Sequence, residues 1–357
     1  MVLFRYYPGI SLANERKRLE YLSDIHKIIE ENTIFIAARL LHEITDQEGI
    51  DINILELSYR AVCDVMSKTV FGNSFNSLAN DESSEGDKSF WMVIKMIHYI
   101  ERENLVPKSS WEKFPNDQVK QSEYIRKFTR FLETMCEKIK NEGSQDGNNF
   151  LAVILASESK SDLSFEEIVG ECLKLFMSSV EICGRTLAFA LYHLGKHPEK
   201  QEKLKNELAL MNKEDISLSS LDEMKYLNAV IKETLRIESL QPYCIKEVKN
   251  PVVLGGYFLP HGTKIYLNYW SIDHDDNIHQ NPIQFIPERW IEGSEKTTHI
   301  DRNDPFSNVA IYELQIFLYY LIKHYEVHTP SDYEIISDGV ISSLGDELFL
   351  NFRSNEI

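Results

Sequence analysis

Apolar residues recur at helical spacing along most of the first 300 positions of this chain. In residues 16–45, for example, Leu19, Leu22, Ile25 and Ile29 are three or four positions apart, a spacing that places them on one face of a helix. The same pattern predicts further helices over 51–70, 90–104, 117–142 and 308–324. Polar, turn-forming residues over 78–90 and 144–149 predict loops between them.

The longest predicted helix runs from a capping box at Ser164 and Glu167 to Gly195, with no proline inside it. Pro198 then opens the next helix at its first turn. About 30 residues make a helix on the order of 45 Å long. Because this helix is rich in Leu and Phe, we expect it to cross the interior of a domain.

The pattern changes after Arg236. Residues 251–270 alternate short β-branched or aromatic runs with Gly-Gly and Pro-His-Gly turns, which predicts a small antiparallel sheet. The tail from Asp332 predicts a hairpin that ends at Leu348 to Phe352. No stretch is rich enough in Gly, Pro or Ser to separate two domains. The predicted fold is therefore a single domain over 1–357, mainly α with small antiparallel β-sheets.

Composition and charge narrow the class of protein. The chain has 38 Lys and Arg against 56 Asp and Glu, for a net charge of −18. This balance predicts no nucleic-acid partner and no generic attraction to anionic lipid, although a local basic patch stays possible. Five cysteines stand singly, which argues against a disulfide framework or a zinc site. Without an apolar run long enough for an anchor, the chain is expected to be cytoplasmic as written.

Three charged residues form a candidate cluster near the chain's third quarter. Glu233 and Arg236 are three positions apart in YLNAVIKETLRI, so they share a helix face and can pair. Most such pairs are solvated bridges worth under about 1 kcal/mol, but this helix is broadly apolar and could bury its pair. Arg289, in the irregular stretch FIPERW, is a candidate third partner. Such a cluster would hold the fold and would have no chemistry of its own.

Taken in order, several segments resemble one family. They are the long helix with Glu181, then HPEKQEKLKNEL, KETLRI, LGGYFLPHGT, FIPERW and DPFS, and then a closing helix. Together they resemble the cytochrome P450 family of haem-thiolate monooxygenases. MKYLNAVIKETLRI, LGGYFLPHGT and DPFS are most similar to the fatty-acid ω-hydroxylase branch of animal microsomal members. The resemblance covers residues 160–357 and, more loosely, 15–80.

The resemblance implies roles for particular residues. Glu233, Arg236 and Arg289 would form the family's structural clamp, and Lys246 would pair with a haem propionate. Glu181 stands at the family's distal acid, whereas Ile182 replaces the hydroxyl residue beside it. The family also implies a haem cofactor, a small lipophilic substrate, a reductase partner and the endoplasmic reticulum membrane.

The sequence departs from the family where the iron ligand should be. A segment like DPFS normally leads into a Gly-x-Arg-x-Cys-x-Gly loop whose cysteine thiolate binds the iron. Here Asn308, which matches the helix after that loop, follows Ser307 directly. No metal ligand is therefore predicted, and the family's N-terminal anchor and first strands are also expected to be absent. Cys183 and Cys244 are the remote alternatives for a thiolate ligand.

Three hypotheses for function follow. In the first, the chain is a catalytically degenerate member of the family, inactive as written. In the second, the sequence lacks a short segment of an active monooxygenase that hydroxylates fatty acids or other lipophilic compounds. In the third, it is a haem-free helical protein with a binding or regulatory role.

Overall fold

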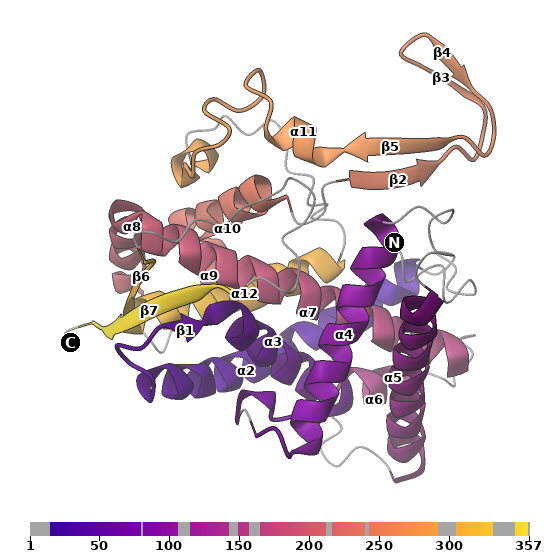
Figure 1. Cartoon of the computed structure of the whole chain (residues 1–357), viewed down its shortest axis with the longest axis horizontal. Coiled ribbons are helices and arrows are strands. Elements are labelled where there is room, and N and C mark those ends of the chain that lie inside the picture. The colour runs from indigo at the N-terminus through magenta and orange to yellow at the C-terminus, as the bar shows by residue number, and fades with distance from the viewer. Residues whose placement is uncertain are drawn as a thin grey trace.

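The computed structural model describes residues 15–79, 81–105, 115–142, 149–156, 165–211, 216–239, 243–291, 305–330 and 347–355. Helices dominate these residues (Figure 1). The longer ones are α2 (Glu15–Thr45), α3 (Ile54–Phe71), α4 (Glu85–Leu105), α5 (Pro115–Glu142), α7 (Phe165–Lys196), α8 (Pro198–Ala209), α10 (Lys225–Glu238) and α12 (Pro305–His324). The shorter helices are η2 (Ser77–Ala79), α6 (Phe150–Ala156), α9 (Leu218–Asp222), α11 (Tyr269–Asp273) and η5 (Pro287–Trp290).

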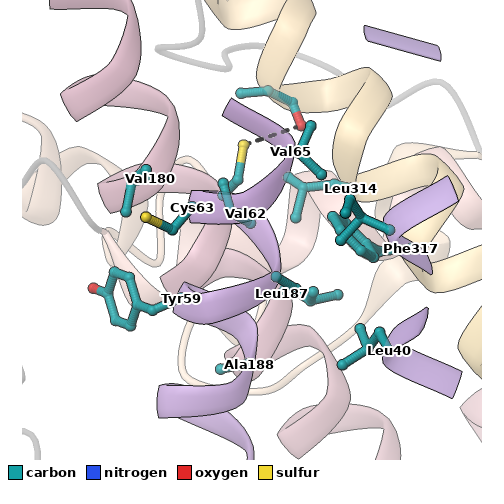
Figure 2. Packing of buried hydrophobic residues seen from close by; sticks show 14 of the residues in the cluster. Leu40, Tyr59, Val62, Cys63, Val65, Val180, Leu187, Ala188, Leu314 and Phe317 are labelled. Atoms are coloured by element: carbon teal, nitrogen blue, oxygen red, sulfur yellow. Dashed lines mark hydrogen bonds between the residues drawn. The ribbon is translucent and has the colours of Figure 1, made fainter. Parts of the chain in front are cut away.

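Helix α7 forms the centre of the hydrophobic core. It packs against α3 on one side and α12 on another, and α12 also packs against α2. Figure 2 shows α3, α7 and α12 meeting through Val62, Val180, Leu187, Leu314 and Phe317. Leu175–Lys196 is long and apolar enough to cross a membrane, but 88% of its most apolar window is buried inside the protein. Burial against other helices explains why this segment is so rich in apolar residues.

A close approach of α3 to α7 depends on Gly184. A Cβ atom placed on this glycine would lie 2.7 Å from Cδ1 of Tyr59 and 3.2 Å from its Cα. Both distances are shorter than ordinary van der Waals contact, so the two helices can pack this closely only because position 184 has no side chain. Tyr59 itself is 2% exposed.

The strands form three small antiparallel sheets. β1 (Ile52–Asn53), β7 (Phe349–Ser354) and β6 (Tyr325–His328) pair in that order. β2 (Tyr243–Glu247) pairs with β5 (Lys264–Asn268), and β3 (Val252–Leu254) pairs with β4 (Tyr257–Leu259). The mainly α fold with small antiparallel sheets is therefore confirmed.

Several predicted boundaries were wrong. The one sheet expected over 251–270 is two separate two-stranded pairs, because β5 pairs back with the unpredicted strand β2. Helix α4 begins inside the predicted polar loop, where Ser84 Oγ accepts a hydrogen bond from the Asp87 amide at 3.0 Å and caps the helix. The tail strand pairs with β1 and β6, while most of the predicted hairpin, like the capping residue Ser164, lies outside the described residues.

Candidate functional site

The carboxylate of Glu233, on α10, accepts five hydrogen bonds. Arg236 donates through Nε to Oε2 at 3.0 Å and through Nη2 to Oε1 at 2.8 Å. Arg289 donates from Nε to Oε1 at 3.1 Å, and the Ile286 amide donates to the same oxygen at 2.9 Å. Trp290 Nε1 donates to Oε2 at 2.8 Å. The structure thus brings together the three charged residues named from the sequence, and Glu233 is completely buried.

Both arginines also donate hydrogen bonds to backbone carbonyls at the end of α11 and in the irregular chain that follows it. Arg236 Nη1 donates to the carbonyl oxygens of Asp273 and Pro282, at 2.7 Å each. Arg289 Nη1 donates to the Gln280 carbonyl oxygen at 2.9 Å. Backbone carbonyls that leave regular structure need donors of this kind when they are buried. The cluster therefore fixes a loop against α10 as well as joining two helices.

The environment keeps Glu233 ionised. Burial alone would raise the pKa of this carboxyl, but the hydrogen bonds and charge of Arg236, the Ile286 amide and the charge of Arg289 outweigh it. The pKa of Glu233 consequently lies below its usual range. A carboxylate with this many donors has no free lone pair with which to act as a general base.

Two further side chains were missed at the sequence level, one in this cluster and one beside it in η5. Trp290 donates directly to Glu233, and its position beside Arg289 in FIPERW was the available signal. Glu288 accepts from Lys200 Nζ at 3.0 Å, Lys203 Nζ at 2.6 Å and the Tyr226 hydroxyl at 3.1 Å, which joins η5 to α8 and α10. Burial would raise the pKa of Glu288, but the two lysines lower it to about 2.

The middle of α7 exposes one side chain, that of Ile182, to solvent. From Ser179 to Gly195 every side chain is buried except those of Glu181, which is half-buried, and Ile182, which is 40% exposed. Thr186 Oγ1 donates to the Ile182 carbonyl oxygen at 2.6 Å, so this hydroxyl bonds the backbone of its own helix.

Helix α12 is continuous from Pro305 to His324 and therefore runs through Ser307 and Asn308. One turn further on it touches α7, where the Cys183 thiol donates to the Ala310 carbonyl oxygen at 3.5 Å. This contact forms part of the closely packed region drawn in Figure 2. The start of α12 is thus an unbroken helix with no intervening loop.

The described cysteine side chains are all buried within helices, and none of them forms a disulfide. They are Cys63 on α3, Cys136 on α5, and Cys172 and Cys183 on α7. Burial raises the pKa of Cys63 and of Cys183 well above the usual range, which disfavours their thiolates. Cys172 hydrogen-bonds to Cys136 and lowers the pKa of that thiol. The side chain of Cys244 lies outside the described residues.

Lys246 lies apart from the Glu233 cluster. It belongs to β2, where it pairs in register with Ile265 of β5, and its side chain is exposed. Figure 1 shows this strand pair extending beyond the helical body.

Comparison with known proteins identifies the family. The sequence model of the cytochrome P450 family matches residues 16–343. The chain belongs to the cytochrome P450 family. This result confirms the resemblance drawn from the sequence, and it implies the family's haem cofactor.

Individual relatives are distant. The probable cytochrome P450 4aa1 of Drosophila melanogaster is 25% identical over 354 residues, covering 89% of this chain and 67% of that relative. The putative cytochrome P450 cyp-13B1 of Caenorhabditis elegans is also 25% identical, covering 81% of this chain and 61% of the relative. The chain therefore spans about two thirds of these two P450 proteins. The crystal structure of the cytochrome P450DA heme domain has a TM-score of 0.78, with 18% identity over 95% of this chain and 76% of that one, which supports the fold.

The described residues of this P450 chain do not fit a haem-thiolate centre. Such a centre needs a cysteine thiolate as the axial ligand. The described cysteines are buried in helices, none of them in α12, and burial disfavours the thiolates of Cys63 and Cys183. No cluster of three or more His, Cys, Asp or Glu suited to a metal occurs among the described residues.

Proposed function

We propose that this chain, with the sequence it has, is a catalytically degenerate member of the P450 family. One observation carries the proposal: α12 is a continuous helix through Ser307 and Asn308, where the family resemblance implies a cysteine-bearing loop. The reaction of such an enzyme belongs to its cofactor, and the protein's part is to bind, orient and tune that cofactor. A chain that offers no thiolate at this position loses that chemistry.

Haem titration of the purified full chain tests the proposal. After reduction and exposure to carbon monoxide, the mixture should show no thiolate-type Soret band. Weak binding without that band is compatible with the proposal, because apolar openings accept porphyrins without a ligand. A stoichiometric thiolate-type spectrum would contradict it. Cys183→Ser and Cys244→Ser variants would then show which thiol binds the iron.

A second candidate is an active monooxygenase whose natural chain carries a further segment between Ser307 and Asn308. The fully hydrogen-bonded cluster around Glu233 supports this candidate, because the three residues that the resemblance assigns to the family's structural clamp contact one another. Its substrate would be a fatty acid or another small lipophilic compound, its partner a reductase, and its location the endoplasmic reticulum membrane. Sequencing the transcript across the codons for Ser307 and Asn308 decides between the two. An uninterrupted junction in every transcript removes the second candidate.

The third hypothesis, a haem-free binding or regulatory protein, is compatible with the first. It gains support only if the chain is expressed and folds without haem. Far-ultraviolet circular dichroism and a cooperative melting transition of the haem-free protein would establish that condition.

A further inference from the structure

Residues 274–286, between α11 and η5, form a loop without helix or strand. The two arginines of the Glu233 cluster hold this loop in place, because they donate to the carbonyl oxygens of Pro282 at 2.7 Å and of Gln280 at 2.9 Å. The position of the 274–286 loop therefore depends on side chains that lie outside it.

His279 is the one ionisable side chain that this loop buries. It is 6% exposed, and its ring lies 6.1 Å from that of Trp290, whose Nε1 donates to Glu233. The Nε2 atom of His279 is buried and has no hydrogen-bond partner among the described residues. A neutral imidazole carries a single N–H, whereas a protonated ring has a donor at both nitrogens and would leave the one at Nε2 unpaired. The site therefore suits the neutral ring.

Charged groups from three elements act on His279. They are Glu233 and Arg236 on α10, Arg289 on η5 and Asp273 on α11. Burial and the two arginines lower the pKa of His279, and the two carboxylates oppose this shift only in part. The other ionisable groups of the loop are engaged elsewhere or exposed: Asp275 accepts hydrogen bonds from Asn277, His274 contacts the Trp270 carbonyl oxygen, and Asp276 is exposed.

We propose that His279 makes the 274–286 loop pH-sensitive: protonation of its imidazole releases the loop from α10 while the helical core stays folded. Protonation adds a third positive charge beside Arg236 and Arg289 in a buried site, and the ring reaches water only if the loop moves. Glu233 stays ionised in mild acid because its own pKa is lowered. The group that titrates in this range is therefore the histidine and not the carboxylate that holds the arginines.

Acid favours the open loop because the released ring binds a proton more tightly than the buried ring does. A histidine in water has a pKa near 6.5, and the pKa of the buried His279 lies below that value. Below pH 6.5 the open loop consequently holds more protons than the closed loop. Its population rises by up to about tenfold per pH unit until the pH passes the lowered pKa. Above pH 6.5 the ring is neutral in both forms and the loop stays closed.

Hydrogen exchange of the full chain, followed by mass spectrometry, tests the proposal. The amides of His279, Gln284 and Ile286 report on the loop, because they donate hydrogen bonds within it or to Glu233. Once corrected for the intrinsic pH dependence of exchange, their protection in wild type should fall roughly three- to tenfold between pH 7.5 and pH 5.5. Amides in residues 184–194 of α7 should keep their protection.

Two variants and a matched control identify the titrating group. His279→Phe and His279→Gln remove the titration, so each should give the loop equal protection at both pH values. His261 is exposed, and His261→Gln should keep the wild-type response.

Three results would overturn the proposal. They are equal protection of the wild-type loop at both pH values, a loss of protection in α7 that accompanies the loss in the loop, and a wild-type response in the His279 variants. The first two results are read from wild type alone, so the test stands even if a variant fails to fold. None of the measurements depends on haem.

Discussion

At the residue scale, Glu313 is the most unusual ionisable group in the described part of the chain. It lies on α12, fully buried, and neither carboxyl oxygen has a well-formed hydrogen-bond partner among the described residues. Burial raises the pKa of Glu313 to about 8, although the neighbouring Cys183 thiol opposes the shift. The folded protein therefore holds this carboxyl in its neutral form at pH 7.

We expect Glu313 to make the protein less stable as pH rises. The pKa in the unfolded chain is near 4.5 and in the folded protein about 8. Between these values the folded state binds more protons, so its stability falls with pH, by up to about 1.4 kcal/mol per unit. Glu313→Gln keeps the shape and removes the titration. Melting curves between pH 5 and 8.5 should show a flatter decline for this variant than for wild type.

A matched change shows whether the effect belongs to Glu313. Glu82 is an exposed residue of a surface loop, and Glu82→Gln should retain the wild-type pH dependence. Equal pH slopes in Glu313→Gln and wild type would contradict the assignment.

Prediction from sequence succeeded at this scale where neighbours are close along the chain or lie in a recognisable segment. Glu233 and Arg236 are three positions apart, and Arg289 lies in FIPERW. By contrast, Cys183 and Glu313 are 130 positions apart and meet only because α7 and α12 cross at one register. Helical periodicity predicts which face of a helix is buried but does not fix where two helices cross.

At the element scale, the two arginines of the Glu233 cluster should contribute unequally to the free energy of unfolding. Arg236 is 2% exposed, and both of its contacts to Glu233 would be lost in Arg236→Leu, at a cost of about 3–5 kcal/mol in unfolding free energy. Arg289→Leu should cost about 1.5–3 kcal/mol, because Glu233 keeps four other hydrogen bonds. Denaturant unfolding measures both values.

Arg130→Leu, on the exposed face of α5, provides the control and should change stability by less than about 0.5 kcal/mol. The expected order is therefore Arg236, Arg289, Arg130. Losses under 1 kcal/mol for both cluster arginines would refute the structural role. Arg18, which has the same helical spacing to Glu15, cannot replace this control because its side chain lies outside the described residues.

The packing of α3 on α7 gives a second prediction at this scale. Gly184→Ala would place a methyl group 2.7 Å from the Tyr59 ring and 3.2 Å from its backbone, so the helices must move apart. Such overpacking costs about 1–3 kcal/mol, although alanine is the better helix former. Thermal unfolding should therefore show a lower melting temperature. Lys138→Ala, at an exposed position of α5, should not lower it, and a stabilised Gly184→Ala variant would disprove the close contact.

The long helices were easier to predict from the sequence than the short strands, for a physical reason. The long helices follow from a period of 3.6 residues, which is a local property of the chain. The β1–β7–β6 sheet pairs Ile52 with Leu350 and Tyr325 with Ser354. The two-residue β1 is too short to show a pattern, and β6 alternates over only four residues, so both strands depend on pairing with distant chain.

At the scale of the whole molecule, the Glu233 cluster is fully formed, while α12 runs unbroken through Ser307 and Asn308. The cluster fixes the loop beside α10, and α7 contacts α12 where the Cys183 thiol donates to the Ala310 carbonyl oxygen. The Glu233 cluster and the start of α12 come from separate segments of the chain. Haem binding therefore depends on whether the segment before Asn308 is the main defect, which a repaired chain can show.

Inserting a Gly-x-Arg-x-Cys-x-Gly segment between Ser307 and Asn308 should produce haem binding with a thiolate-type spectrum after reduction and exposure to carbon monoxide. The shortened α12 would then begin beside the new thiolate, and a helix N-terminus favours an anion by about 0.3–1 kcal/mol. The same insertion with serine in place of cysteine should bind haem more weakly and without that spectrum, which separates the ligand from the added loop. If the cysteine version takes up no haem although it melts cooperatively, restoring the ligand loop is not sufficient. The haem-binding site must then depend on structure other than α7, α12 and the Glu233 cluster.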